Sequence, residues 1–152
     1  MAWTQLSRLE DRYGVTLDLV PVLYAGLLEA NGQLGPGEVP AKGRWMSKNL
    51  LRKAVPLGVP LNPPAFLPFN PLLALRMSLL PLENAERRAP IAALFRAVWV
   101  RGLHVSEAAV VEDVANDVGL PGAALVAHAQ TPEIKSRLRR QTDEEFPVGS
   151  LV

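Results

Sequence analysis

The chain has 152 residues, a length typical of one domain with its own hydrophobic core. Its 16 basic and 15 acidic residues nearly cancel and are interspersed, which disfavours nucleic acid and membranes as partners. Cysteine is absent, so disulfides, thiolate metal sites and CxxC redox pairs are excluded within this sequence. With no signal-peptide core and no run of ~20 apolar residues, we expect a soluble, cytoplasmic protein.

The first elements are predicted from the spacing of apolar residues. Residues 4–13 predict an amphipathic helix that Gly14 ends. Residues 15–21 alternate aliphatic and polar side chains and predict the only convincing strand of the chain. A single strand cannot satisfy its own edges, so it needs partner strands that the sequence does not obviously supply.

Residues 22–30 predict a second helix, and residues 31–40 predict an ordered loop because they include three glycines and two prolines. Helical spacing resumes from residue 41 through an apolar series made of Trp45, Leu50, Leu51 and Ala54. A basic cluster accompanies this helix, formed by Lys42, Arg44, Lys48, Arg52 and Lys53. It is either a solvated helix face or a site for a carboxylate or phosphate.

The proline-rich residues 57–71 predict an extended segment. It ends at Asn70, an N-cap, and Pro71, the expected first position of a helix that runs to residue 80. Residues 81–88 predict a charged connection to the next helix.

A further helix is predicted over residues 90–102, from Pro90 to Gly102. Five large side chains recur at positions i, i+3, i+4, i+7 and i+8, namely Ile91, Leu94, Phe95, Val98 and Trp99. We expect that face to be buried and this helix to be the central one of a helical layer.

Three more helices are predicted over residues 106–118, 123–130 and 133–145. Ser106 is the expected N-cap of the first, and Thr131-Pro132 marks the start of the last. No set of catalytic residues is complete: the serines lack a nucleophile-elbow pattern, and the glycine-rich loop lacks phosphate-loop spacing. His104 and His128 lack carboxylates at ligand spacing, so no metal site is predicted.

The order of the segments resembles the 2-hydroxychromene-2-carboxylate isomerases, relatives of the kappa-class glutathione transferases in the DsbA-like branch of the thioredoxin superfamily. The resemblance extends from about residue 3 to residue 145. It is carried by VTLDLVPVLYAGLL, GQLGPGEVPAKGRWM, LGVPLNPPAFLPFNPLLALR, ALFRAVWVRGLHVSEAAVVEDVANDVGL and AQTPEIKSRLRRQTDE, in this order.

The resemblance implies a mainly α fold, with a helical insertion and a partial DsbA-like thioredoxin α/β domain of few strands. Residues 1–152 then form one domain. Residues 1–34 belong to the thioredoxin-like part, 35–130 to the helical insertion, 131–146 to a helix that returns to the thioredoxin-like part, and 147–152 to a divergent tail.

The function that the resemblance implies is isomerisation of a small aromatic carboxylate in aromatic catabolism, with glutathione as cofactor. The oligomeric state is left open, with a homodimer as one alternative. Gln33 falls in the glutathione-contacting loop of the family, Lys42 on its recurrent lysine, and Asn70 on the asparagine before the LLALR helix. A lysine ammonium and side-chain amides suit the carboxylates and peptide groups of glutathione.

The family's catalytic serine lies in a D-x-x-S-P-Y turn, and no serine of this chain corresponds to it. No catalytic residue is therefore predicted, and we expect a chain truncated at both ends, with impaired activity. The alternative is a non-catalytic helical module that binds a partner through the strand edge and exposed apolar surface. A thiol oxidoreductase is excluded because there is no cysteine.

Overall fold

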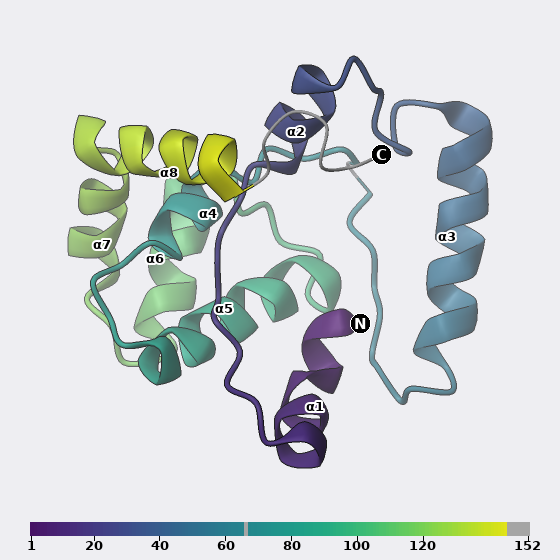
Figure 1. Ribbon diagram of the computed structural model, residues 1–152, viewed down its shortest axis with the longest axis horizontal. Helices are drawn as coiled ribbons and strands as arrows, with labels where there is room; N and C mark the ends of the chain where they lie inside the picture. The colour runs from purple at the N-terminus through teal and green to yellow at the C-terminus, as the bar shows by residue number, and fades with distance from the viewer. Residues whose placement is uncertain (66, 146–152) are drawn as a thin grey trace.

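The structure, a computed structural model, describes residues 1–65 and 67–145. Figure 1 shows a helical body in which α5 crosses the middle of the view and α4, α6, α7 and α8 gather to its left. The helices are η1 (Ala2–Gln5), α1 (Leu6–Tyr13), α2 (Tyr24–Ala30), α3 (Pro40–Ala54), α4 (Leu72–Met77), α5 (Asn84–Trp99), α6 (Ala108–Asn116), α7 (Gly122–Ala129) and α8 (Pro132–Glu145). The prediction of a mainly helical chain is thereby confirmed.

The strand predicted over residues 15–21 is wrong. This segment has no regular secondary structure, and residues 1–65 and 67–145 contain no strand. Alternation of side chains specifies an extended backbone, but a strand also needs a neighbouring strand to exchange hydrogen bonds with. The partial thioredoxin sheet that the resemblance implies is thus not seen in this part of the chain.

Side chains from three helices take the place of a neighbouring strand along this segment. The Leu17 N–H donates to Glu10 Oε1 of α1 at 3.2 Å, and Arg87 of α5 donates to the Leu19 carbonyl at 2.7 Å. Pro21 accepts from Gln141 Nε2 of α8 at 2.8 Å. These bonds satisfy backbone groups that would otherwise depend on solvent.

Thr142 of α8 makes the last of these contacts. Its buried hydroxyl accepts the Leu23 N–H at 3.0 Å and donates to the Leu138 carbonyl at 2.8 Å. One hydroxyl therefore joins α8 to the residue that precedes α2.

The central helix α5 begins six residues earlier than predicted. The prediction of a charged connection over residues 81–88 is therefore wrong, because the helix already starts at Asn84. Its start is a capping box in which Glu83 donates its N–H to Glu86 Oε2 at 3.2 Å. Pro90 lies inside the helix rather than at its start. The helix ends at Trp99, three residues before the predicted end, and Gly102 adopts the left-handed conformation predicted for it, at φ 68°.

The largest group of buried residues joins α4, α5, α6 and α7. Its buried members are Met77, Leu80, Leu94, Ala97, Val98, Val105, Val111, Val114, Ala115 and Val126. Gly122 lets α7 approach α6 closely, since a Cβ at this position would lie 2.3 Å from the Glu112 carbonyl oxygen. A smaller group joins α4 to α8 through Leu79, Ile134 and Leu138.

Helix α3 stands apart on the right of Figure 1. Of its predicted apolar series only Ala54 is buried, while Trp45 is 65% exposed and Leu51 is 52% exposed. Helical periodicity groups apolar residues on one face of a helix, but it does not show whether another helix covers that face.

Two caps also differ from the prediction. Glu107, rather than Ser106, is the N-cap of α6. Pro71, expected as the first helical residue, instead precedes α4, although the Asn70 side chain still accepts the Leu72 N–H at 3.0 Å. The helices begin one or two residues from the predicted position, as is common for helix ends.

The division of the chain at residues 34/35 and 130/131 remains a prediction, and the predicted divergent tail over 147–152 lies outside the described residues. Among the helices over residues 1–65 and 67–145, none combines the length and apolar composition needed to span a membrane.

We predict that Thr142→Val destabilises the protein by about 1–3 kcal/mol, because the Leu23 N–H loses its buried acceptor. Thr142→Ser keeps the hydroxyl and is the matched control, with a smaller loss. The free energy of unfolding from urea titration measures both. Equal stability of Thr142→Val and the parent protein would contradict the assigned contact.

Candidate functional site

Two cavities adjoin α5. The α4–α5 cavity, of about 380 Å³, lies between α4, α5 and the irregular segment before α2. Its lining residues are almost all apolar: Trp3, Leu19, Val20, Pro21, Val22, Phe69, Pro71, Ala74, Leu75, Ser78, Ile91, Leu94, Phe95, Val98, Trp99 and Val105. Both its size and its apolar lining are typical of small-molecule sites.

The α3–α5 cavity, of about 520 Å³, lies between the first residues of the chain, α3, the extended segment and α5. Its lining residues are Met1, Ala2, Trp3, Thr4, Leu50, Val59, Pro60, Leu61, Ala92, Phe95, Arg96, Trp99 and Val100. Arg96 is the only residue in this set with a charged side chain.

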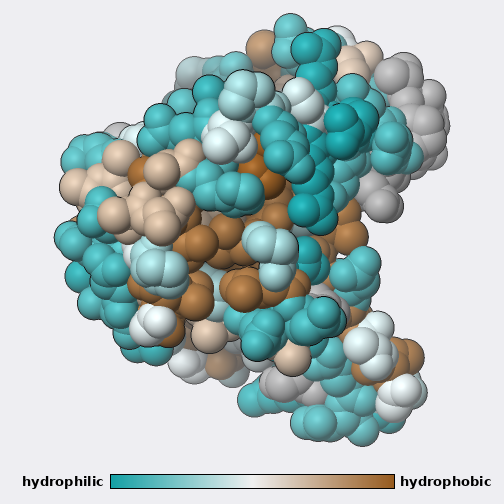
Figure 2. Space-filling view, turned by 90° about the vertical axis from the view of Figure 1, so that its left-hand side faces the viewer, coloured by the Kyte–Doolittle hydropathy of each residue, from teal (hydrophilic) through white to brown (hydrophobic). Residues whose placement is uncertain are grey.

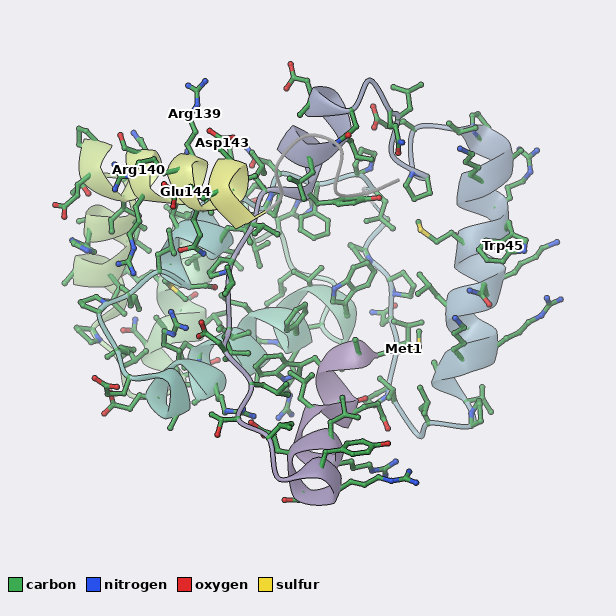
Figure 3. The ribbon with its side chains drawn as sticks, viewed as in Figure 1. Met1, Trp45, Arg139, Arg140, Asp143 and Glu144 are labelled. Atoms are coloured by element: carbon green, nitrogen blue, oxygen red, sulfur yellow. The ribbon has the colours of Figure 1, made fainter. Side chains whose placement is uncertain are left out.

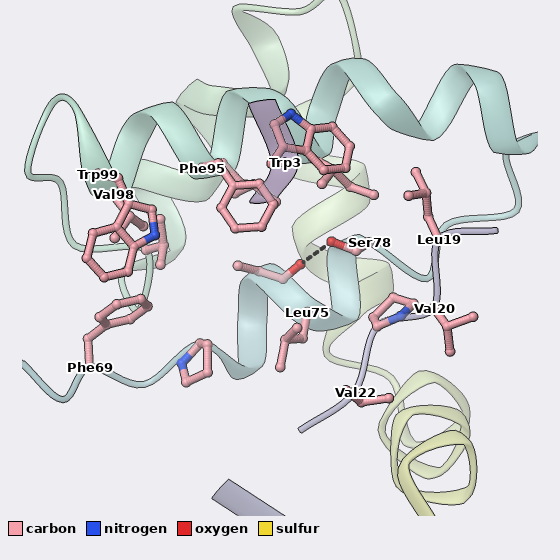
Figure 4. Close-up of a pocket in the computed structure, with 16 residues that line it drawn as sticks. Trp3, Leu19, Val20, Val22, Phe69, Leu75, Ser78, Phe95, Val98 and Trp99 are labelled. Carbon is pink, nitrogen blue, oxygen red and sulfur yellow. Dashed lines mark hydrogen bonds between the residues drawn. The ribbon is translucent and has the colours of Figure 1, made fainter. Parts of the chain in front are cut away.

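Three aromatic residues, Trp3, Phe95 and Trp99, line both cavities. The ring centroids of Trp3 and Phe95 are 5.5 Å apart, and Trp99 meets Phe69 edge to face at 6.3 Å. Figure 4 shows Phe95 between α5 and α4, with Trp3 on one side and Trp99 on the other. The two cavities therefore share an aromatic wall.

The predicted apolar face of α5 is only partly buried. Leu94 and Val98 are buried, but Phe95 is 45% exposed. Phe95 projects toward the cavities instead of into the helical core, so the expectation that all five large residues are buried is wrong. The space-filling view of another side of the molecule likewise shows apolar side chains gathered in a hollow with a hydrophilic rim (Figure 2).

Few polar side chains reach the cavities. The Ser78 hydroxyl, in the α4–α5 cavity, donates to the Ala74 carbonyl of its own helix at 3.0 Å (Figure 4). No histidine or carboxylate is among the described residues that line either cavity, so a nucleophile activated by a neighbouring base is not assembled there. Residues 1–65 and 67–145 also hold no group of three metal-ligating side chains.

The three residues predicted to bind the cofactor lie around one loop, residues 31–39. Gln33 is exposed and its backbone N–H donates to the Leu28 carbonyl at 2.8 Å. Lys42 is exposed in the first turn of α3, and Asn70 is exposed before α4.

Ordinary van der Waals contacts at two glycines place this loop beside its neighbouring segments. A Cβ at Gly43 would lie 3.4 Å from the Pro36 carbonyl oxygen, and one at Gly37 would lie 3.9 Å from Pro68. The loop therefore adjoins both the start of α3 and the segment before Asn70. None of the three predicted residues lines either cavity.

The sequence prediction missed Trp3 and Arg96 as site residues. Trp3 precedes the first predicted helix, so no pattern marked it. Arg96 could have been found, because it and Arg101 are the only charged residues in the stretch 90–102.

Comparisons with known proteins agree on one family. The family model of the DSBA-like thioredoxin domain matches residues 1–148. Human glutathione S-transferase kappa 1 is 26% identical over 156 residues, which cover 96% of this chain and 69% of the human protein. The solved structure of a 2-hydroxychromene-2-carboxylate isomerase superposes with a TM-score of 0.83 at 23% identity, over 94% of this chain and 70% of that chain.

We predict that Asn70→Ala destabilises the protein by about 1 kcal/mol, because the Leu72 N–H at the start of α4 loses its acceptor. Asn70→Asp retains a carboxylate oxygen at that position and should remain close to the parent protein. Urea denaturation of both variants separates this structural role from any role in binding, and a loss of stability in Asn70→Asp as large as in Asn70→Ala would contradict it.

Proposed function

The chain belongs to the DsbA-like thioredoxin domain family, and from this premise we propose that it is a glutathione-dependent protein of the 2-hydroxychromene-2-carboxylate isomerase type. In this proposal it binds glutathione and a small aromatic carboxylate in the cytoplasm. The similarity to the human kappa-class transferase and to the isomerase structure supports the proposal.

The observation that carries the proposal is the aromatic-walled α3–α5 cavity and its relation to α3. Leu50 of α3 lines that cavity. Lys42 precedes Leu50 by eight residues, and residues at i and i+8 share one face of a helix. A ligand that occupies the cavity and extends along α3 therefore approaches the Lys42 ammonium.

The three predicted residues suit the parts of glutathione. The Lys42 ammonium would bind a carboxylate, and the Gln33 side-chain amide would pair with a peptide group. Asn70 uses Oδ1 to accept the Leu72 N–H, which leaves its amide N–H groups to donate to the cofactor. Because no serine of this chain corresponds to the catalytic serine, binding is a more direct test than turnover.

We predict that Lys42→Ala weakens glutathione binding about tenfold, because a charge-assisted hydrogen bond to a carboxylate is lost. Isothermal titration calorimetry gives the dissociation constant. Lys48→Ala is the matched control: it removes the same charge from the same helix, but six residues on, where the side chain points in another direction. No binding to the parent protein, or equal weakening by both variants, would refute the proposed cofactor site.

The second candidate function is a non-catalytic interaction module, and the outer side of α3 favours it. Figure 3 shows Trp45 on the side of α3 away from the body. Trp45 is 65% exposed and Val55, which directly follows the helix, is 82% exposed. Exposed tryptophan is a frequent anchor of protein interfaces.

If this candidate holds, the chain forms dimers in sedimentation velocity, and the double variant Trp45→Ser, Val55→Ser weakens dimerisation by about tenfold or more. Tyr13→Ser, which replaces an exposed aromatic residue on α1, is the control and should leave dimerisation unchanged. A protein that stays monomeric at every concentration tested excludes self-association through α3.

A further inference from the structure

One side of α3, here called the outer α3 face, carries both apolar and basic side chains. Six residues of the helix and its C-cap share this face, because each lies three or four positions from another member: Arg44, Trp45, Lys48, Leu51, Arg52 and Val55. All six are exposed, and the three apolar ones are each more than half exposed. Figure 3 shows Trp45 pointing away from the body.

Helix α3 packs on the body through the opposite side. That side carries Met46 and Leu50, which are half-buried, and Ala54, which is buried. These three residues recur every four positions, as expected for one face of a helix, and Leu50 lines the α3–α5 cavity. The outer α3 face is therefore a second apolar surface, in addition to the one that packs.

The apolar side chains of the outer α3 face, rather than its charges, indicate a partner. Water hydrates an exposed ammonium or guanidinium, so a basic side chain on a surface needs no partner in the molecule. A single exposed apolar residue is also common. Trp45, Leu51 and Val55, however, form a group on one helix face, and exposed apolar patches mark sites where proteins or membranes bind.

The charges decide which of these two partners fits. Lys48 lies at the centre of the outer α3 face, between Trp45 and Leu51 in the sequence. The centre of a protein interface is depleted of charged residues, lysine among them. A membrane surface accepts both kinds of side chain, because tryptophan and aliphatic groups enter the headgroup region while cations bind lipid phosphates.

The surroundings of α3 reinforce the positive charge. The helix contains five basic residues and no acidic one, and no acidic residue occurs from residue 39 to residue 82. Within residues 1–65 and 67–145, Arg44, Lys48 and Arg52 form no ion pair. The near balance of charge over the whole chain therefore does not describe this helix.

We infer that the outer α3 face binds the surface of a membrane that contains anionic lipids. Its three apolar side chains enter the headgroup region, and its three cations bind lipid phosphates. Helix α3 lies at the edge of the molecule, so a flat surface can reach it (Figure 1). The inference goes beyond the proposed function and requires neither glutathione nor an aromatic acid.

The experiment measures binding of the full chain to lipid vesicles by co-sedimentation. Vesicles of phosphatidylcholine are compared with vesicles in which about one third of the lipid is phosphatidylglycerol, which is anionic. The parent protein should bind the anionic vesicles about tenfold or more tightly than the neutral ones, and high salt should weaken that binding.

A triple variant tests the cations of the outer α3 face. Arg44→Gln, Lys48→Gln, Arg52→Gln should weaken binding to the anionic vesicles about a hundredfold, because three basic residues near the anionic surface are lost.

The matched control removes three exposed basic residues from α8 by Lys135→Gln, Arg139→Gln, Arg140→Gln. Figure 3 shows Arg139 and Arg140 on the far side of the molecule from Trp45. This control has the same net charge as the first triple variant and should bind nearly as the parent protein does.

Two variants of Trp45 test the apolar contact. Trp45→Ser should weaken binding about tenfold, whereas Trp45→Phe keeps an aromatic ring and should retain most of it. Brominated lipid should quench tryptophan fluorescence in the parent protein and quench it much less in Trp45→Phe, because Trp3 and Trp99 pack on rings of the body. Circular dichroism checks that the helical content of each variant is kept.

Equal binding of the parent protein to both kinds of vesicle, equal weakening by the two triple variants, or unchanged binding of Trp45→Ser would overturn the inference. Dimers that Trp45→Ser weakens, without vesicle binding, would assign the outer α3 face to a protein contact and overturn it as well. A chain that binds vesicles but not glutathione would refute the proposed function alone.

Discussion

The fold depends on how the irregular segment between α1 and α2 forms hydrogen bonds with its backbone N–H and C=O groups when no neighbouring strand is present. Glu10, Arg87, Gln141 and Thr142 supply the hydrogen bonds, from three helices that are far apart in the sequence. Glu10 also pairs with Arg88, so one carboxylate joins α1, the segment and α5. Because residues 19–22 of this segment line the α4–α5 cavity, the same contacts hold one wall of that cavity in place.

Helix α5 connects the packing of the body to the chemistry of the site. One part of its surface carries Leu94, Ala97 and Val98 into the buried core. Phe95 and Trp99 line both cavities, and Arg96 lines only the α3–α5 cavity. A rigid helix whose neighbouring residues serve the core and a cavity can hold aromatic rings and a charge in a fixed relation, as a binding site requires.

Helix α3 has the opposite character, since it is joined to the body mainly by the segments on either side of it (Figure 1). From residue 39 to residue 82 the sequence contains six basic residues and no acidic one, so this region is positive in a chain of net charge +1. The exposed ammonium of Lys42 and the exposed ring of Trp45 lie on the same helix. Helix α3 thus carries both the lysine proposed to bind a carboxylate of the cofactor and the exposed tryptophan on which the second candidate function, an interaction module, rests.

The sequence by itself determined the helices, the left-handed glycine ends at Gly14 and Gly102, and the family, because these follow from local spacing, backbone conformation and the order of segments. It gave the wrong structure for residues 15–21, since a strand is defined by partners elsewhere in the chain. It also expected the whole apolar face around Phe95 to be buried, because periodicity marks an apolar face without showing what lies opposite. Only the tertiary structure decided that Phe95 borders two cavities and that Trp3 meets it there, because that contact joins parts of the chain about ninety residues apart.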